Sequence, residues 1–76
     1  MNPEIKKKIL SVANQSEIGR RLGKKPQTVN LWFKNEVPPS EVLSLCSCVD
    51  WVVTPHELRP DIYPNQRDGL PDLTAA

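Results

Sequence analysis

Few residues of this chain can do chemistry on their own: two cysteines, Cys46 and Cys48, and one histidine, His56. Cysteines two positions apart are too close for an easy disulfide and are two ligands short of a closed zinc site. We therefore expect both thiols to stay reduced and to pack as small apolar residues on a helix. A single histidine without a positioned nucleophile or carboxylate relay is typical of a structural role. The sequence thus predicts no catalytic residue, metal or cofactor.

Charged residues are unevenly distributed along the chain. The 76 residues include 10 Lys or Arg and 9 Asp or Glu, which gives a net charge of +1. Residues 1–34 hold eight basic and two acidic residues, a net +6, whereas residues 35–76 hold two basic and seven acidic residues, a net −5. A basic half favours a polyanionic partner, because each phosphate that is neutralised releases counterions. A solvated lysine-rich surface is the alternative.

The length of the chain and its hydropathy limit the class of protein. Seventy-six residues make one domain at most. No apolar run is long enough to span a bilayer, and residues 1–15 lack the apolar centre of a signal peptide. We therefore expect a soluble, cytoplasmic protein without a membrane partner.

Helix start and stop residues predict an all-α fold, a compact bundle of four to five short helices. Asn2 and Pro3 open the first helix, because Asn caps a helix N-terminus and Pro fits the first helical position. This helix has one apolar stripe, which stops at Asn14 and comprises Ile5, Ile9, Val12 and Ala13. Pro39 opens the fourth helix, which we expect to end at Asp50.

The last part of the chain predicts a short closing element and a tail. Thr54 and Glu57 have the spacing of a capping box, which predicts a short fifth helical turn. Residues 65–76 contain turn and breaker residues, few apolar side chains and no period. We therefore divide the chain into a helix-turn-helix domain over residues 1–64 and a flexible C-terminal tail over residues 65–76.

Residues 15–34 have the pattern of a helix-turn-helix, with helices predicted at 15–22 and 26–34. Gly23 tolerates the positive φ of a tight helix end, and Pro26 fits only the first turn of the helix that follows. The positions that pack the two helices together are Ile18, Gly19, Leu22, Val29 and Trp32. The glycine among them lets the two backbones approach closely. Two ordinary packed helices are the alternative interpretation.

This pattern resembles the lambda-repressor-like family, and within it the phage Cro repressors and the YdaS-type antitoxin regulators. The resemblance covers residues 14–64, and it includes Val37-Pro38-Pro39 and the closing segment VTPHELRPDIYP. Two positions depart from the family pattern. Lys24 stands where an aliphatic residue is usual, and Lys25 stands where a capping Ser or Thr is usual. Both add charge and cost local stability.

The resemblance implies that the second helix of the pair enters the major groove of DNA and reads base edges. The base-reading residues that it implies are Gln27, Thr28 and Asn30. Gln and Asn can bond adenine in bidentate fashion, and the Thr methyl can meet a thymine methyl, which favours sites with A·T pairs. The phosphate contacts that it implies are Gln15, Ser16, Lys24, Lys25 and Lys34.

The two tryptophans have different expected roles. Trp32 occupies the closing apolar position of the helix-turn-helix, which predicts packing in the core. Trp51 forms an apolar run with Val52 and Val53, and this run either covers the core or joins a partner subunit.

These observations lead us to expect a non-enzymatic transcriptional regulator, a Cro-like repressor of a phage or prophage. We expect it to bind double-stranded operator DNA as a homodimer, with half-sites one helical turn apart. The alternative is a YdaS-type antitoxin that acts mainly by binding a partner toxin protein. Neither function requires a cofactor.

Overall fold

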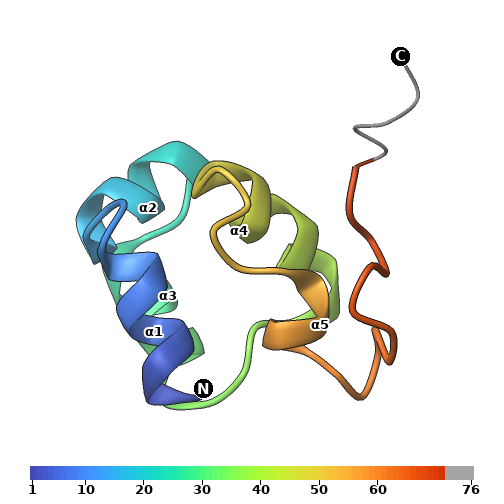
Figure 1. Cartoon of the computed structure of the whole chain (residues 1–76). Coiled ribbons are helices and arrows are strands. Elements are labelled where there is room, and N and C mark those ends of the chain that lie inside the picture. The colour runs from blue at the N-terminus through green and yellow to red at the C-terminus, as the bar shows by residue number, and fades with distance from the viewer. Residues whose placement is uncertain (72–76) are drawn as a thin grey trace.

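Every regular element of the protein is helical within residues 1–71, which are the residues that the computed structural model describes (Figure 1). The elements in chain order are α1 (Pro3–Leu10), α2 (Gln15–Leu22), α3 (Pro26–Lys34), the 3-10 turn η1 (Pro39–Glu41), α4 (Val42–Cys48) and α5 (Pro55–Leu58). The predicted all-α bundle is confirmed, and α2 and α3 have the predicted bounds. No helix within these residues has the length and apolar character that crossing a membrane requires.

The helices pack around one hydrophobic core. α2 packs on α3 and α4, and α4 packs on α5. α1 contacts α3 and α5 through its lysines: the ammonium of Lys6 lies 5.6 Å from the centre of the Phe33 ring, and Lys8 pairs with Glu57 at 2.9 Å. The buried apolar side chains are Ile5, Ile9, Ala13, Ile18, Val29, Trp32, Phe33, Val37, Val42, Leu45, Cys46, Val49, Val53 and Leu58. The predicted core position of Trp32 is therefore confirmed.

The starts of α1 and α5 lie where the capping residues predict them, whereas the predicted start of the fourth helix at Pro39 is wrong: Pro39–Glu41 form the 3-10 turn η1, and α4 begins at Val42. The side chain of Asn2 accepts a hydrogen bond from the Glu4 N–H at 2.8 Å, which satisfies one of the free donors of α1. At α5, the Thr54 hydroxyl accepts from the Glu57 N–H at 3.1 Å, and the Glu57 carboxylate accepts from the Thr54 N–H at 3.0 Å. This reciprocal pair is the predicted capping box.

The first helix is shorter than its apolar stripe predicts. α1 ends at Leu10, and the Val12 N–H bonds to the Ile9 carbonyl in a tighter turn. The cause lies in the residue that follows: Asn14 adopts an extended backbone in order to cap α2, so the chain must leave the helix before it. Ala13 is buried although it lies after the helix and not within it.

The end of α4 also differs from the prediction. The helix stops at Cys48, two residues before Asp50, because Asp50 and Trp51 both take left-handed backbone angles, with φ of 55° and 59°. The Trp51 N–H then donates to the Cys46 carbonyl at 2.9 Å. This bond closes the helix end and returns the chain toward α5.

The segment after α5 packs on the domain. The Nδ1–H of His56 donates to the Tyr63 carbonyl at 2.8 Å, and Arg59 donates to the Val37 carbonyl at 2.8 Å. Residues 65–71 continue past α5 (Figure 1), and a Cβ built on Gly69 would lie 3.0 Å from atoms of Leu43 and Pro55. The flexible tail expected over residues 65–76 falls in part on residues 72–76, which lie outside the described residues.

Candidate nucleic-acid interface

The turn between α2 and α3 is fixed by two glycines. Gly23 takes a left-handed φ of 68°, and the Lys24 N–H donates to the Gly19 carbonyl at 2.8 Å. This 6→1 bond ends α2 in a Schellman-type turn. A Cβ built on Gly19 would lie only 2.5 Å from the Lys24 carbonyl oxygen. The sequence predicts a close approach at Gly19 between the two helices; the structure places it instead between α2 and the turn that precedes α3.

The outward face of α3 carries Gln27, Leu31 and Lys34. These three side chains are exposed, whereas Val29 and Trp32 face the core. The spacing of i, i+4 and i+7 places the three exposed residues in one row along the helix. Thr28 and Asn30 are half-buried and lie on either side of this row. Of the three predicted base readers, Gln27 is thus central, and Thr28 and Asn30 are at the edges.

Asn30 is held by the helix that precedes it. The Nε2 of Gln15, the first residue of α2, donates to Oδ1 of Asn30 at 3.3 Å. At the same end of α2, Asn14 accepts from the Glu17 N–H at 2.8 Å, and Ser16 is exposed. The N-terminus of α2, which carries the predicted phosphate contacts Gln15 and Ser16, therefore lies beside one edge of the α3 face.

The predicted phosphate-binding lysines differ in their surroundings. Lys24 forms an ion pair with Glu41 at 3.1 Å, which neutralises part of its charge. Lys25 and Lys34 are exposed, and neither has an acidic ion-pair partner within residues 1–71. Lys25 occupies the N-cap position of α3 without making a side-chain capping bond. Two full positive charges thus stand at the two ends of α3.

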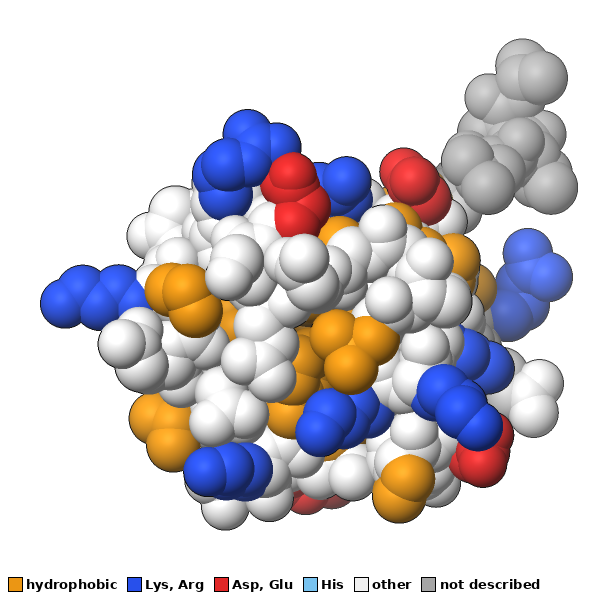
Figure 2. Space-filling view, turned by 90° about the vertical axis from the view of Figure 1, so that its left-hand side faces the viewer, with side chains coloured by type: hydrophobic (Ala, Val, Ile, Leu, Met, Phe, Trp, Pro, Cys, Tyr) orange, Lys and Arg blue, Asp and Glu red, His pale blue; other side chains and the backbone are white. Residues whose placement is uncertain are grey.

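The two arginines of α2 are engaged in contacts within the protein. Arg20 binds the carboxylate of Glu17 at 2.6 Å, and the guanidinium of Arg20 lowers the pKa of Glu17. Arg21 donates to the Cys48 carbonyl at 2.6 Å. Figure 2 shows the side of the molecule that lies to the left in Figure 1; Lys and Arg side chains are spread over this face, and one group of apolar side chains is exposed near its middle. The charge on this face is predominantly positive.

Sequence reasoning missed Leu31. Its side chain is 56% exposed, the largest exposed fraction among the large apolar residues of the described chain. The signal was present in the sequence, because Leu31 follows Gln27 by four residues and precedes Lys34 by three. The family resemblance implies only Gln27, Thr28 and Asn30 as base readers, and it does not extend to Leu31.

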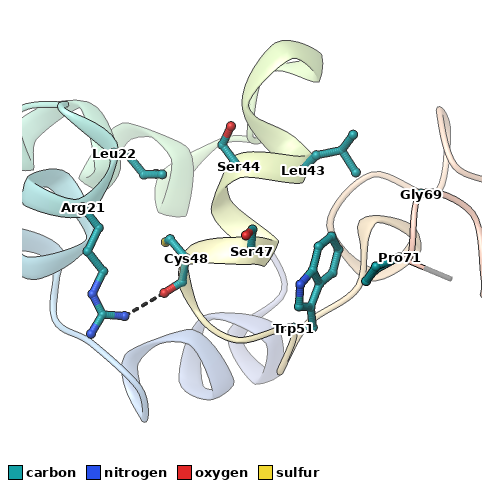
Figure 3. Close-up of a pocket in the computed structure, with 9 residues that line it drawn as sticks. All are labelled: Arg21, Leu22, Leu43, Ser44, Ser47, Cys48, Trp51, Gly69 and Pro71. Atoms are coloured by element: carbon teal, nitrogen blue, oxygen red, sulfur yellow. Dashed lines mark hydrogen bonds between the residues drawn. The ribbon is translucent and has the colours of Figure 1, made fainter. Parts of the chain in front are cut away.

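A second surface feature is a shallow groove of about 620 Å³ between the end of α2 and α4 (Figure 3). Its apolar walls are formed by Leu22, Leu43 and Trp51, and its floor by the small side chains of α4. Trp51 is half-buried and packs against the core with part of its ring, while the rest of the ring faces the groove beside Pro71. Trp51 therefore covers the core and is also accessible to a partner.

The two cysteines lie in surroundings that disfavour reactive thiolates. Cys46 is a free thiol buried in the core, and burial raises its pKa to about 12. Burial also raises the pKa of Cys48, which is half-buried. A thiol with a raised pKa is a poor nucleophile at neutral pH, since the thiolate is the reactive form. Within residues 1–71, no three His, Cys, Asp or Glu side chains are grouped so that they could hold a metal ion.

Comparison with known proteins gives one family. Residues 5–67 match the model of the family described as "Bacterial toxin YdaS". No curated protein and no solved structure matches the chain significantly.

Proposed function

The chain belongs to the YdaS family, and we propose that it is a sequence-specific DNA-binding transcriptional regulator whose α3 enters the major groove. The observation that carries this proposal is the exposed face of α3, where a hydrogen-bonding side chain, Gln27, lies between Lys25 and Lys34, two exposed lysines without an acidic ion-pair partner within residues 1–71. Such a face combines groups that bond base edges with charges that bind the backbone.

The dimensions of α3 fit this role. A helix with its side chains is about 10–12 Å in diameter, and the major groove of B-DNA is about 12 Å wide, so the nine-residue α3 can lie in the groove. Phosphate backbones border the groove on both sides. Lys25 and Lys34 would then contact phosphates, while the side chains between them face base edges.

We propose that Lys24 contributes less than Lys25 to DNA binding. The Lys24 ammonium is already paired with Glu41 at 3.1 Å, so its contact with a phosphate must compete with that carboxylate. Gln15 and Ser16, at the N-terminus of α2, would bind a phosphate through backbone N–H groups and the Ser16 hydroxyl.

We further propose that the regulator binds as a homodimer, as a repressor of the Cro type. One reader helix covers only a few base pairs, and a two-fold dimer doubles the recognised sequence. The surface available for this contact is the groove beside α4, where Leu43 is 43% exposed and Trp51 is half-buried. Most residues that line this groove lie in the acidic half of the chain, which a DNA duplex would repel, although Arg21 and Leu22 of the basic half also line it.

Titration against DNA tests the regulator. The full chain is titrated against the DNA upstream of its own reading frame and against random duplex of equal length, at several salt concentrations. We expect tighter binding to the upstream DNA and a steep decrease of affinity with salt, which reflects several released counterions. Equal affinity for the two duplexes would contradict sequence-specific regulation.

The alternative function is protein binding: an antitoxin that acts mainly on a partner toxin, or a toxin itself, as the description of the family reads. The apolar groove with Trp51 favours this alternative, because it offers a surface for a protein partner. Expression of the chain in bacteria separates the two. If the growth defect caused by expression disappears in the Gln27→Ala, Lys25→Ala double variant, the chain acts through DNA. If the defect persists in that folded variant, the chain acts through a protein partner.

A further inference from the structure

Leu31 is the most exposed large apolar side chain within residues 1–71, and the core does not explain its position. It is 56% exposed, and it lies on the side of α3 opposite the buried Val29 and Trp32. A single exposed leucine is ordinary on a protein surface. Leu31 differs because it is surrounded along the helix by residues that suit a polyanion and its bases: Gln27 one turn before it and Lys34 about one turn after it.

From this placement we propose that Leu31 is a specificity-determining residue that contacts the C5-methyl group of a pyrimidine in the major groove. This inference rests on the proposed function. The C5-methyl of thymine is the apolar group that an unmodified base pair presents in the major groove, and apolar side chains recognise it by direct contact. 5-Methylcytosine presents the same group at the same position.

The other residues of the α3 face are less suited to this contact. The methyl of Thr28 is on a half-buried side chain at the edge of the exposed row, and Asn30 shares its Oδ1 with Gln15 at 3.3 Å. Gln27 is polar and bonds donors and acceptors. Leu31 alone places a branched apolar group at the centre of the row.

The charge at the two ends of α3 selects DNA over a protein as the occupant of this face. Lys25 and Lys34 are exposed and have no acidic partner within the described chain. A protein surface covering Leu31 would need acidic groups at both ends of α3 to neutralise these lysines, whereas the two phosphate backbones that border a major groove supply negative charge on both sides. A thymine in the major groove provides this arrangement: its methyl group can contact Leu31 while the phosphates on either side of the groove contact the two lysines.

Substitution of uracil for thymine removes the methyl group and nothing else. A bound duplex is first selected from a random pool with the full chain, and each thymine in it is then replaced singly by uracil. We expect one replacement to weaken binding of the wild type by roughly fourfold, the equivalent of burying one methyl group. The Leu31→Ala variant is expected to bind the thymine and uracil duplexes equally. At the same position, 5-methylcytosine is expected to bind more tightly than cytosine to the wild type and equally to Leu31→Ala.

Thr28→Ser, which removes only the methyl of Thr28, is the matched control and should keep the uracil penalty. The proposal is overturned if the penalty persists in Leu31→Ala or if it disappears in Thr28→Ser. Failure of the wild type to select any duplex would instead contradict the proposed function itself. Circular dichroism of both variants confirms that they fold, which the exposed position of Leu31 leads us to expect.

Discussion

The side-chain amide of Gln15, at the first residue of α2, donates a hydrogen bond to Oδ1 of Asn30 on α3 across 3.3 Å. This bond links the two helices of the helix-turn-helix at the edge of the proposed DNA face. It also directs the Nδ2 donors of Asn30 away from Gln15. Asn30 is therefore oriented in the free protein, which would reduce the side-chain entropy lost in the proposed contact with DNA.

Loss of this pair should change specificity in a non-additive manner. Asn30→Ala is expected to relax discrimination at one base pair by about 1 to 3 kcal/mol. Gln15→Ala should have a smaller effect of the same kind, because it frees Asn30 to rotate. The double variant should then resemble Asn30→Ala alone. Dissociation constants for the selected duplex and its single-base variants measure this coupling, and strictly additive losses would show that the two residues act separately.

Lys25 is expected to trade stability for DNA affinity. Lys25→Ser should weaken binding to all duplexes alike and reduce the salt slope by about one, because it removes one phosphate contact. The same change supplies the capping hydroxyl that α3 lacks, so the free energy of unfolding should rise by about 1 kcal/mol.

The matched control is Arg67→Ser, which removes one positive charge from the segment that follows α5. It should leave the salt slope nearly unchanged. Urea unfolding and binding isotherms at three salt concentrations measure both effects. An equal change of slope in the two variants would mean that only the total charge matters.

Gly19 should tolerate no larger side chain. A Cβ at this position would lie 2.5 Å from the Lys24 carbonyl oxygen, so Gly19→Ala must displace the turn. We expect a loss of about 1 to 3 kcal/mol in the free energy of unfolding. Ser44→Ala, on the exposed face of α4, is the control for helix propensity and should be close to neutral. Thermal unfolding compares the two, and a wild-type melting temperature for Gly19→Ala would refute the close approach.

Stability should fall at acid pH through Glu57. Burial favours its neutral form, but hydrogen bonds from Lys8 and Thr54 hold the pKa of Glu57 below the ordinary 4.5. A carboxyl group with a lowered folded pKa contributes stability above its unfolded pKa, and that contribution is lost as pH falls through the folded value. Glu57→Gln keeps a capping side chain but lacks the charge. Its unfolding free energy should therefore decrease less than that of the wild type between about pH 6 and about pH 3, as urea unfolding measures; equal decreases would assign the acid sensitivity to other groups.

Local signals in the sequence explain which parts of the fold could be predicted. Gly23 predicts the end of α2 and Pro26 predicts the start of α3 to the residue. A left-handed helix end and a proline at the first helical position each have one compatible place in this segment. The end of α1 could not be read from its apolar stripe, since the capping demand of Asn14 overrides the helical period. The left-handed backbone at Trp51 has no signal in residue type, as tryptophan rarely adopts it.

The candidate site was predictable in outline and not in its pairings. Gln27 and Lys25 lie where the helix-turn-helix pattern places them. The ion pair of Lys24 with Glu41 and the hydrogen bond of Gln15 with Asn30 join residues that are 17 and 15 positions apart in the sequence, so they depend on tertiary structure. These pairings change the expected contribution of each residue to DNA binding.

A footprint of the purified full chain on the DNA upstream of its own reading frame tests the central claim most directly. We predict protection of two short segments about one helical turn apart, roughly 34 Å, with the protection lost in the Gln27→Ala, Asn30→Ala variant. That variant changes side chains on the proposed DNA face and should remain folded by circular dichroism. Uniform cleavage of the DNA at concentrations where the folded wild type is in excess, or protection that is identical in the variant, would contradict recognition of DNA by α3.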